Sequence, residues 1–454
     1  MGKFGRKRVI VIGGNAAGMT AASRLRRLDA EAEVTVLERS AYISYSICGT
    51  PYLLEGLVGS HLDLLAFTPE AVRSERGIEV RTECEATQIS IARREIQCRD
   101  LRSRLAASIP FDSVVVATGY QPSDGSIVGA DHRGVFKISQ LEDVIRLNRF
   151  LDTGPRTAVV VGGGYVGLNT AEALSKRGLS VTLLERADQV FPAVDPPIAS
   201  MVERECRAGG VQILLLTPAE QILSDAGRPV AVQAGGRSLP ADLVVVDVGI
   251  RPNVDLACQA GLRIGAAGGI SVSPRMETSQ DGIYAAGNCA ETTHLITARP
   301  VTSALGTHAV KQGRVAGENI AGVRSEFPGV LQTSVTRFFG LSVGRTGLSE
   351  QEARGFGFDC SAVSVETPSR AAYYGDAEKV TFRLIFDCRT LRLLGAQTAG
   401  APWTAKRIDV AAAAITGGMT LSQIAQLDLA YSPPHAPLWD PLQVAANAAL
   451  RQLR

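Results

Sequence analysis

The sequence predicts an α/β protein built around two similar βαβ units, and two observations support this fold class. The segment RVIVIGGNAAGMTAASRLRRLDAEAEVTVLER, which starts at residue 8, recurs in outline as RTAVVVGGGYVGLNTAEALSKRGLSVTLLER, which starts at residue 156. Each copy reads as an apolar strand, a glycine-rich turn, an Ala/Leu-rich helix and a second strand that ends in an acidic residue. The chain has 454 residues, too many for one hydrophobic core, so we expect two or three domains.

Composition excludes several classes of partner and location. Hydrophobic residues make up 45% of the chain, charged residues 20%, and the formal net charge is +2, which favours neither nucleic acid nor an anionic membrane. No apolar run approaches the roughly 18 residues of a membrane span, and the apolar run at 9–12 is too short for a signal peptide. The eight cysteines show neither CxxC pairs nor zinc-site spacing, so we expect a cytoplasmic protein without a metal site or a disulfide framework.

The glycine-rich turns are candidate dinucleotide sites. Glycines let the backbone turn sharply and approach a pyrophosphate, which the amides and dipole of the following helix stabilise. Glu38 and Glu185 follow the last glycine of their motifs by 20 and 18 residues, where a carboxylate can accept hydrogen bonds from ribose hydroxyls. One such motif alone could be a tight strand-to-helix turn without a ligand, but two complete units favour two dinucleotides. The candidate residues are Gly13, Gly14, Ala16, Ala17, Gly18, Glu38, Arg39 and Ser44 in the first unit, and Gly162, Gly164, Tyr165, Val166, Gly167, Glu185 and Arg186 in the second.

Two further segments indicate which dinucleotide binds where. VVVATGYQP at 114–122 and GIYAAGNCAE at 282–291 each read as a short strand that opens into a turn of small residues. Together with the repeat they resemble the flavin-binding segments of the two-dinucleotide disulfide reductases. The resemblance implies that the first unit holds FAD, the second unit holds NAD(P)H and a C-terminal α+β domain forms a homodimer. The flavin residues carried over are Thr118, Gly119 and Asn288, the last standing where the family usually has aspartate, and Gly249 joins the nucleotide site.

The same resemblance implies a domain organisation. Residues 1–120 and 245–325 would form a discontinuous FAD domain, 121–244 the NAD(P)H domain and 326–454 the dimerisation domain. Glu185 favours NADH, because its charge repels a 2′-phosphate, whereas Arg186 could bind that phosphate, so NADPH stays possible. Asn169 replaces a glutamate that relatives commonly place near the nicotinamide or flavin.

Cys48, in SYSICGTPYLLEG at 44–56, is the candidate redox centre. By itself it could be an inert buried thiol. Pro51 suits the first turn of a helix, which would place Cys48 just before a helix N-terminus, where a thiolate is stabilised. No second cysteine lies within five residues after it, so the segment resembles the single-cysteine branch of the family. That branch holds the coenzyme A disulfide reductases with related NADH oxidases, peroxidases and persulfide reductases.

The resemblance to this branch continues through TSVTRFFGLSVGRTGLSEQEA, KRIDVAAAAITGGMT and LDLAYSPP, and it implies a reaction. NADH would reduce FAD, the electrons would reach a mixed disulfide or other oxidised form of Cys48, and the Cys48 thiolate would attack the next disulfide. By resemblance Tyr431 of the other subunit would donate a proton to the departing thiolate, with Tyr373 or Tyr374 lining the same pocket. For Tyr373 and Tyr374, packing in the dimer interface is an equal alternative.

The substrate is only partly indicated. Arg24, Arg27 and Arg76 stand where the family contacts coenzyme A, and arginine suits its phosphates, although RLRRLD could be a solvated helix face. Ile47 and Val310 are apolar where relatives are often polar, and Trp403, His435 and Trp439 depart from the family pattern. We therefore expect a low-molecular-weight disulfide, coenzyme A disulfide or a similar one, or a persulfide.

Two alternatives stay open. NADH oxidases and peroxidases usually carry a histidine in the first glycine loop, where this chain has Ala16; His294 and His308 are expected to be structural. A flavoprotein that passes electrons from NADH to a small carrier protein would use Cys48 only for packing. A nucleotide-sensing dimer without turnover is a third possibility, disfavoured by two intact cofactor units.

Overall fold

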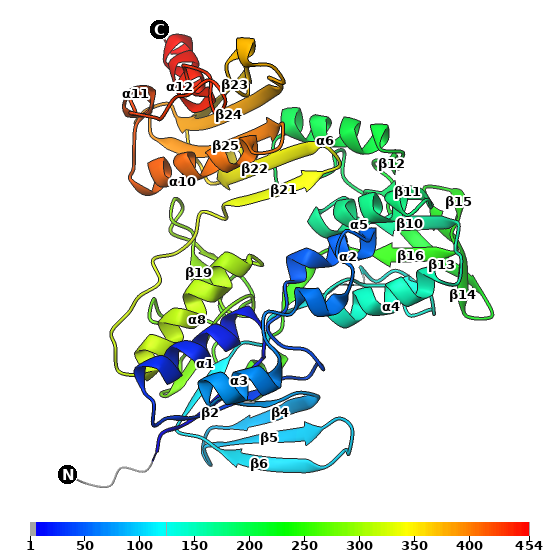
Figure 1. The fold of residues 1–454 in the computed structure, drawn as a ribbon, viewed down its shortest axis with the longest axis vertical. Coiled ribbons are helices and arrows are strands. Elements are labelled where there is room, and N and C mark those ends of the chain that lie inside the picture. Colours follow the sequence, from blue (N-terminus) through cyan, green and yellow to red (C-terminus); the bar gives the residue numbers. More distant parts are fainter. Residues whose placement is uncertain (1–5, 124, 454) are drawn as a thin grey trace.

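The computed structural model describes residues 6–123 and 125–453 and contains two parallel sheets and one large antiparallel sheet, each covered by helices (Figure 1). The two parallel sheets share one plan, in which a central strand, a glycine turn, a helix and a second parallel strand follow one another. The predicted α/β fold with two Rossmann-like units and a third, antiparallel C-terminal part is confirmed.

The first parallel sheet has the strand order β18-β7-β1-β2-β3. Its edge strand β18 follows all strands of the second sheet in the sequence. Helices α1 and α8 lie side by side on one face (Figure 1). The elements are β1 (Arg8–Ile12), α1 (Ala16–Leu28), β2 (Glu33–Leu37), α3 (Pro69–Arg76), β3 (Glu79–Arg81), β7 (Ser113–Val116), β18 (Ile283–Ala285) and α8 (Gly306–Ile320).

Glycine makes the close packing of α1 on α8 possible. A Cβ atom on Gly313 would lie 2.2 Å from the carbonyl oxygen of Ala17, and one on Gly317 would lie 2.6 Å from that of Ala21. Real Cβ atoms do not approach oxygens so closely, so both positions require glycine. The backbones of α1 and α8 therefore touch directly behind the first glycine turn.

The second parallel sheet has the order β12-β11-β10-β16-β9. Residues 158–161 of its central strand pair with 243–246 on one side, just as the central strand of the first sheet pairs with β7. The elements are β9 (Val135–Phe136), α4 (Leu141–Leu151), β10 (Thr157–Val161), α5 (Tyr165–Lys176), β11 (Ser180–Leu184), α6 (Pro196–Ala208), β12 (Gln212–Leu214) and β16 (Leu243–Val246).

Smaller sheets flank the two units. One antiparallel sheet of three strands extends the first unit and another extends the second, while a two-stranded ribbon joins the units. The strands are β4 (Cys84–Ser90), β5 (Glu95–Asp100) and β6 (Ala106–Pro110); β13 (Ala219–Asp225), β14 (Arg228–Ala234) and β15 (Arg237–Pro240); and β8 (Tyr120–Pro122) paired with β17 (Ile250–Pro252). The short helix α7 (Asp255–Gln259) and the ribbon of β19 (Thr292–Thr293) and β20 (Pro300–Val301) complete this part.

The C-terminal part is an antiparallel sheet in the order β21-β22-β25-β24-β23 with helices packed on it. Its strands are β21 (Ser334–Phe338), β22 (Leu341–Gly347), β23 (Cys360–Pro368), β24 (Lys379–Asp387) and β25 (Leu393–Gly400). Its helices are α9 (Glu350–Gly355), α10 (Ile408–Thr416), α11 (Leu421–Ala425) and α12 (Pro441–Gln452), with single 3₁₀ turns η3 (Ala372–Tyr374) and η4 (Thr404–Arg407).

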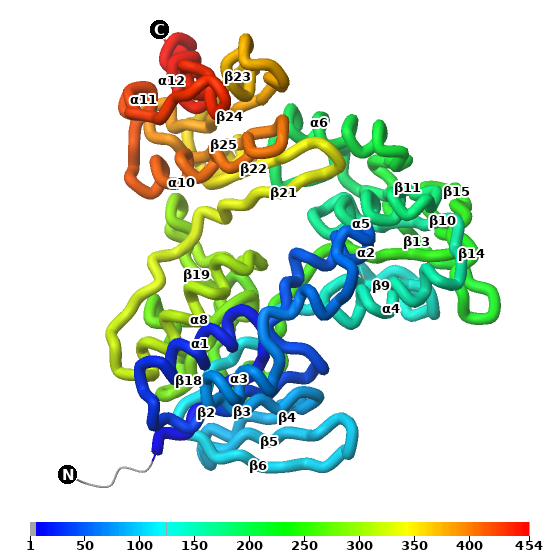
Figure 2. The backbone as a smooth tube through the Cα atoms, viewed as in Figure 1, coloured from blue at the N-terminus to red at the C-terminus, as the bar shows by residue number. Residues whose placement is uncertain are grey.

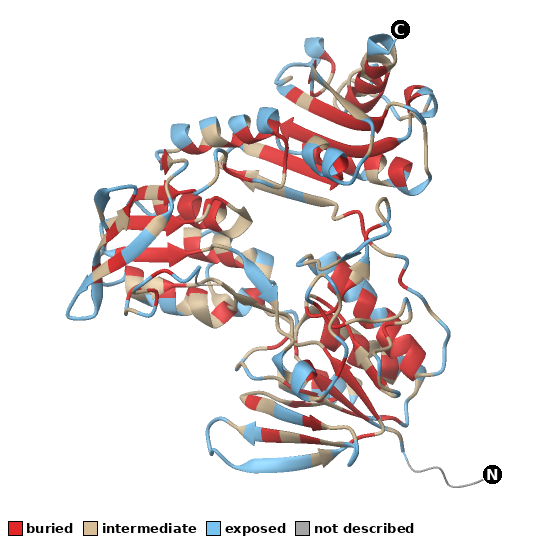
Figure 3. Ribbon diagram, turned by 180° about the vertical axis from the view of Figure 1, so that it is seen from behind, coloured by how far each residue is buried: buried red, intermediate tan, exposed pale blue. Residues whose placement is uncertain are grey.

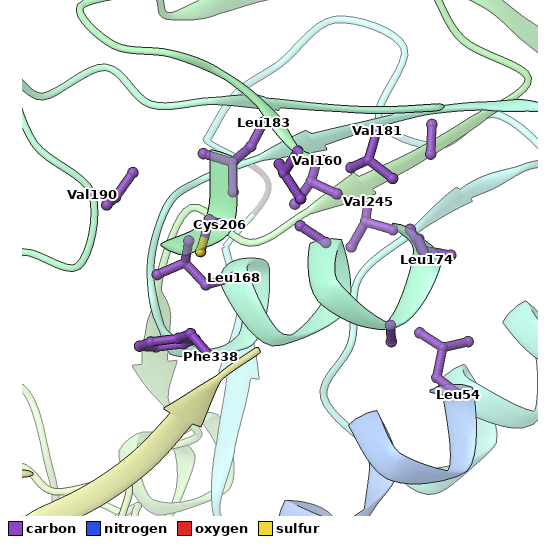
Figure 4. Packing of buried hydrophobic residues seen from close by; sticks show 14 of the residues in the cluster. Leu54, Val160, Leu168, Leu174, Val181, Leu183, Val190, Cys206, Val245 and Phe338 are labelled. Atoms are coloured by element: carbon purple, nitrogen blue, oxygen red, sulfur yellow. The ribbon is translucent and has the colours of Figure 1, made fainter. Parts of the chain in front are cut away.

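Burial follows the sheets: the strands at the centre of each part are buried and the outer faces of the helices are exposed (Figure 3). One excursion of the first unit departs from this separation. After the 3₁₀ turn η1 (Ile47–Gly49), helix α2 (Thr50–Glu55) crosses to the second unit, and the chain returns through η2 (His61–Leu64) (Figure 2). Leu54 of α2 packs with Leu174 of α5 in one buried cluster (Figure 4). In the described residues no helix is both long and apolar enough to cross a membrane.

Candidate active site

The two glycine turns have matching backbone geometry. Gly13 has φ +111° and Gly162 has φ +108°, a region that side chains avoid. A Cβ atom on Gly13 would lie 2.2 Å from the carbonyl oxygen of Ala117, and one on Gly162 would lie 1.9 Å from that of Asp247. Both turns therefore present bare backbone at the start of a helix, the arrangement that suits a pyrophosphate.

The two predicted ribose carboxylates are held in the same way. Glu38 accepts hydrogen bonds from the amides of Gly14, at 2.6 Å, and Ser40, at 2.7 Å. Glu185 accepts them from Gly163, at 2.7 Å, and Ala187, at 2.8 Å. Each carboxylate oxygen keeps a further lone pair for a hydroxyl group.

Glu38 also has a perturbed acidity. Burial raises the pKa of the Glu38 carboxyl, against the lowering effect of the Ser40 and Gly14 amides. The same two amides that perturb the acidity fix the carboxylate at the mouth of the first glycine turn.

A cavity of about 450 Å³ extends from this turn along the carboxyl ends of the first sheet. It brings together most of the predicted flavin residues: Gly13, Ala16, Ala17, Glu38, Arg39, Thr118, Gly119 and Asn288. Residues 84–87, at the start of the small sheet, also line it. A glycine cradle at a helix start, a carboxylate for a ribose and a cavity that both line fit a bound dinucleotide.

A second cavity, of about 720 Å³, adjoins the first, and both are lined by Asn15, Ala16 and Tyr45. The three predicted substrate arginines, Arg24, Arg27 and Arg76, lie together in its wall, and Arg314 of α8 joins them. Ser44, which the sequence assigns to cofactor binding, lines this second cavity.

Two of these arginines are fixed by one carboxylate. Arg24 pairs with Glu318 at 2.6 Å and Arg314 pairs with it at 2.9 Å. Burial raises the pKa of Glu318, but hydrogen bonds from Ser325, Arg314 and Arg24 outweigh that effect and hold the pKa at about 2. The guanidinium of Arg76 lies 3.9 Å from the centre of the Phe67 ring, so the cavity offers ordered cations for an anionic ligand.

Cys48 directly follows two residues that line the cavities. Ser46 lines the second cavity and Ile47 the first, and the exposed Cys48 follows them in η1, immediately before α2. Pro51 occupies the first turn of α2. The prediction that Cys48 precedes a helix N-terminus is confirmed, and its exposure excludes a purely buried thiol.

Helix α2 holds Cys48 against the second unit. Glu55 pairs with Lys176 of α5 at 2.7 Å, and the carbonyl of Leu54 accepts a hydrogen bond from Arg177 at 3.2 Å. These bonds and the leucine packing of Figure 4 anchor α2, the helix that follows Cys48, on the second unit.

Tyr120 is a site residue that sequence reasoning missed. It lines the first cavity, and burial, followed by the charges of Asp247, Cys48 and Asp143, raises its pKa to about 12. Its position in the flavin segment VVVATGYQP was the available signal.

In the second unit, Tyr165 begins α5 and its hydroxyl lies 2.6 Å from the hydroxyl of Ser334 in β21. Val166 follows it, and Asn169 donates to the carbonyl of Tyr165 at 2.8 Å. Arg186 and Gly249 are exposed. At the position where relatives commonly have glutamate, the Asn169 side chain therefore hydrogen-bonds the backbone of its own helix.

The predicted tyrosines lie on the C-terminal part. The hydroxyls of Tyr373 and Tyr431 are 3.2 Å apart, and this bond raises the pKa of Tyr431. Tyr374 is exposed and does not take part in this hydrogen bond. The structure thus selects Tyr373 over Tyr374 as the neighbour of Tyr431.

Arg407 ties the segments of this tyrosine surface together. It donates to the carbonyls of Ser369, at 3.1 Å, and His435, at 3.0 Å, and pairs with Asp440 at 3.0 Å. Trp403, 86% exposed, and Trp439, 56% exposed, lie beside these anchor points in the chain. Large exposed aromatic side chains on a surface organised from below are typical of a contact surface.

The remaining candidates divide by burial. Val310, on α8, is 44% exposed. His308 is buried and bonded to Ser303 at 2.7 Å, His294 is buried, and Cys289 is buried among backbone carbonyls. These two histidines and Cys289 therefore have structural environments.

With this geometry in view, comparison with known proteins identifies the class. The family described as pyridine nucleotide-disulphide oxidoreductase matches residues 7–313, and its dimerisation domain matches residues 333–441. The chain belongs to the pyridine nucleotide-disulphide oxidoreductase family, and it is an oxidoreductase.

Its relatives narrow the class further. The NAD(P)H sulfur oxidoreductase (CoA-dependent) of Pyrococcus furiosus is 39% identical, over 97% of this chain and 99% of the relative. The coenzyme A disulfide reductase of Staphylococcus haemolyticus is 27% identical, over 95% of this chain and 96% of the relative. The structure of a NAD-dependent persulfide reductase from A. fulgidus superposes with a TM-score of 0.95 at 40% identity, covering 98% of this chain and 83% of that one.

Proposed function

We propose that this protein is an FAD-dependent NAD(P)H oxidoreductase that reduces a coenzyme A disulfide or a coenzyme A persulfide through Cys48. One observation carries the proposal: a cavity suited to a dinucleotide adjoins a cavity lined by four arginines, and the exposed Cys48 directly follows Ser46 and Ile47, which line them. Coenzyme A carries several phosphates, which arginines bind well. Relatives named for coenzyme A-dependent sulfur and persulfide reduction support this substrate class.

In this proposal the cofactor sites follow the sequence assignment. Residues 1–120 and 248–325 hold FAD, 121–247 hold NAD(P)H and 326–454 form the homodimer, in the cytoplasm; the sequence boundary at 244/245 is moved because β16 (Leu243–Val246) pairs within the second sheet. Bound FAD supplies a carrier that takes a hydride from NAD(P)H and delivers an electron pair to sulfur. Glu185, whose carboxylate is held beside Gly163, favours NADH over NADPH.

The chain supplies the sulfur chemistry. The Cys48 thiolate attacks the substrate disulfide, the S–S bond of the substrate breaks, and one thiolate leaves while Cys48 forms a mixed disulfide. An electron pair and a proton then cleave the mixed disulfide to the Cys48 thiolate and a second free thiol. A persulfide follows the same course, with hydrosulfide as one product.

The partner subunit completes the site in this proposal. The bonded pair Tyr373 and Tyr431 donates a proton to the departing thiolate of the opposite active site. A phenol is suited to this, because its usual pKa of about 10 keeps it protonated near neutral pH. The exposure of Tyr431, 42% within one chain, leaves it free to meet a second copy.

Reduction of oxygen or peroxide as the main activity is disfavoured. Ala16 lines both cavities at the place where oxidases usually carry a histidine, so no imidazole of the glycine loop can act on an oxidised cysteine. Because the NADH oxidase of Methanocaldococcus jannaschii is 35% identical to this chain, oxygen should be tested as a control substrate.

The test compares wild type with Cys48→Ser and with Cys258→Ser, an exposed cysteine distant in sequence from the site. Cys48→Ser should bind FAD and be reduced by NADH normally but lose at least a thousandfold in turnover with coenzyme A disulfide and with coenzyme A persulfide. Cys258→Ser should match wild type. Retention of disulfide and persulfide reduction by Cys48→Ser, or rapid Cys48-independent reduction of a carrier protein, would refute the proposal.

A further inference from the structure

The N-terminal cap of helix α5 comes from Asp247, a residue distant in sequence that directly follows strand β16. The first amides of a helix need acceptors, which a Ser, Thr, Asp or Asn at the N-cap position usually provides. The N-cap residue of α5 is Gly164, which has no side chain. Instead, a carboxylate oxygen of Asp247, the residue after β16, accepts the amide hydrogen of Gly167 at 2.6 Å. The cap thus leaves the glycine turn free of side chains.

The internal repeat shows that this carboxylate is special to the second unit. Asp247 and Ala117 occupy equivalent places: each follows its strand directly, and each amide donates at 2.8 Å to the last residue of the central strand, Val161 or Ile12. The positive-φ glycine of each turn lies against the carbonyl group of Ala117 in the first unit and of Asp247 in the second. The first unit therefore has a methyl group where the second unit has a carboxylate.

The surroundings of Asp247 disfavour its charge. Burial raises the pKa of the Asp247 carboxyl, the Gly167 amide opposes that effect, and the negative charge of Glu185 adds to it. The groups that interact with it are Glu185, which follows β11, Tyr120 on β8 and the α5 amide. An anion here lies at the helix start that would receive the pyrophosphate of a dinucleotide, so two negative charges would share one site.

We propose that Asp247 is a positioning residue for the pyridine nucleotide, which caps α5 from strand β16 and takes up a proton when the nucleotide pyrophosphate binds. This inference rests on the proposed assignment of NAD(P)H to the second unit. A protonated carboxyl still accepts the Gly167 hydrogen bond through its carbonyl oxygen, so the cap persists while the charge is removed. Nucleotide affinity then falls as the pH rises through the pKa of Asp247.

The test measures NAD⁺ binding to the FAD-loaded dimer by calorimetry from pH 5.5 to 8.5, without turnover. Asp247→Asn keeps an acceptor for Gly167 and removes the charge. We expect it to bind NAD⁺ on the order of tenfold more tightly than wild type at pH 8.5, and we expect this difference to shrink toward the acid end. The matched control is Asp242→Asn, because Asp242 accepts backbone amides at the opposite end of β16.

A second readout tests the cap itself. Asp247→Ala copies the residue of the first unit, and amide hydrogen exchange in the first turn of α5 should be faster in it than in wild type and Asp247→Asn. The proposal is overturned if Asp247→Asn shows the wild-type pH dependence, or if exchange in Asp247→Ala is unchanged. Failure of wild type to bind NAD⁺ at all would instead refute the nucleotide assignment itself, and this inference with it.

Discussion

A buried ionic cluster joins the second unit to the C-terminal sheet, and Arg383→Met tests its contribution. Arg383, on β24, pairs with Asp195 at 2.9 Å and with Glu350, and donates to Ser364 at 3.0 Å. Asp195 comes directly before α6, so the pair crosses between parts. The exposed fractions of the Arg383 and Asp195 side chains are 11% and 3%.

The magnitude follows from what the substitution leaves behind. Removing one partner of a buried ion pair costs about 3–5 kcal/mol, because the other charge stays buried without its counter-ion. Asp195 keeps hydrogen bonds from Gln397 and from the Glu350 amide, so we expect the lower end, about 3 kcal/mol. Lys379→Met, which removes an exposed pair with Glu366 on the same sheet, should cost less than about 1 kcal/mol.

Differential scanning calorimetry of the FAD-loaded protein measures this effect. With an unfolding entropy of about 2.1 cal/mol/K per residue, about 3 kcal/mol lowers Tm by about 3 °C if all 454 residues unfold together. If residues 333–441 unfold as their own unit, the same energy lowers Tm by about 13 °C. A Tm of Arg383→Met that matches wild type and Lys379→Met would show that the cluster contributes nothing net, and would refute this reasoning.

Two further variants test the site and its pH dependence. Arg407→Met removes the hydrogen bonds that hold the segments carrying Tyr373 and Tyr431. The kcat for the disulfide should therefore fall ten- to a hundredfold with unchanged FAD content, whereas the neighbouring Lys406→Met should keep the wild-type kcat. Equal kcat values in both variants would contradict this role of Arg407. Burial, and secondly the charge of the Lys311 side chain, lowers the pKa of His308 to about 4. The neutral imidazole therefore contributes its full stabilisation of the fold above about pH 6.5. As the pH falls from 6.5 to 4, we expect the free energy of unfolding to decrease by about 2 kcal/mol. Urea unfolding at pH 4.5 and 7 should show that loss in wild type and not in His308→Gln, and the same loss in both proteins would count against it.

Local patterns in the sequence predicted the two units of strand, glycine turn, helix and strand. Both strand, glycine, helix and strand sequences, with their terminal glutamates, have the expected positions. Such units are readable because strand burial, positive φ and helix starts are set by neighbouring residues. The segments 114–122 and 282–291 also begin with the expected short strands, which pair with each other only in the folded sheet.

Contacts between distant segments were less predictable. Nothing in the local sequence indicated that Asp247 caps a helix that begins 82 residues earlier at Tyr165, or that Tyr373 and not Tyr374 meets Tyr431. Arg24 and Arg27 could have been part of a solvated helix face, and only the packing of α1, α3 and α8 gathers them with Arg76 around one cavity.

The sequence by itself determined the fold class, the repeated nucleotide-binding turn and the single-cysteine character of the site. Those properties depend on residue type and short spacing, which the chain carries whether or not it is folded. The tertiary structure decided that Cys48 is exposed next to residues that line both cavities, and that the helix after it is anchored on the second unit. Such placement depends on the packing of segments more than a hundred residues apart, which the burial of side chains from both units fixes only on folding.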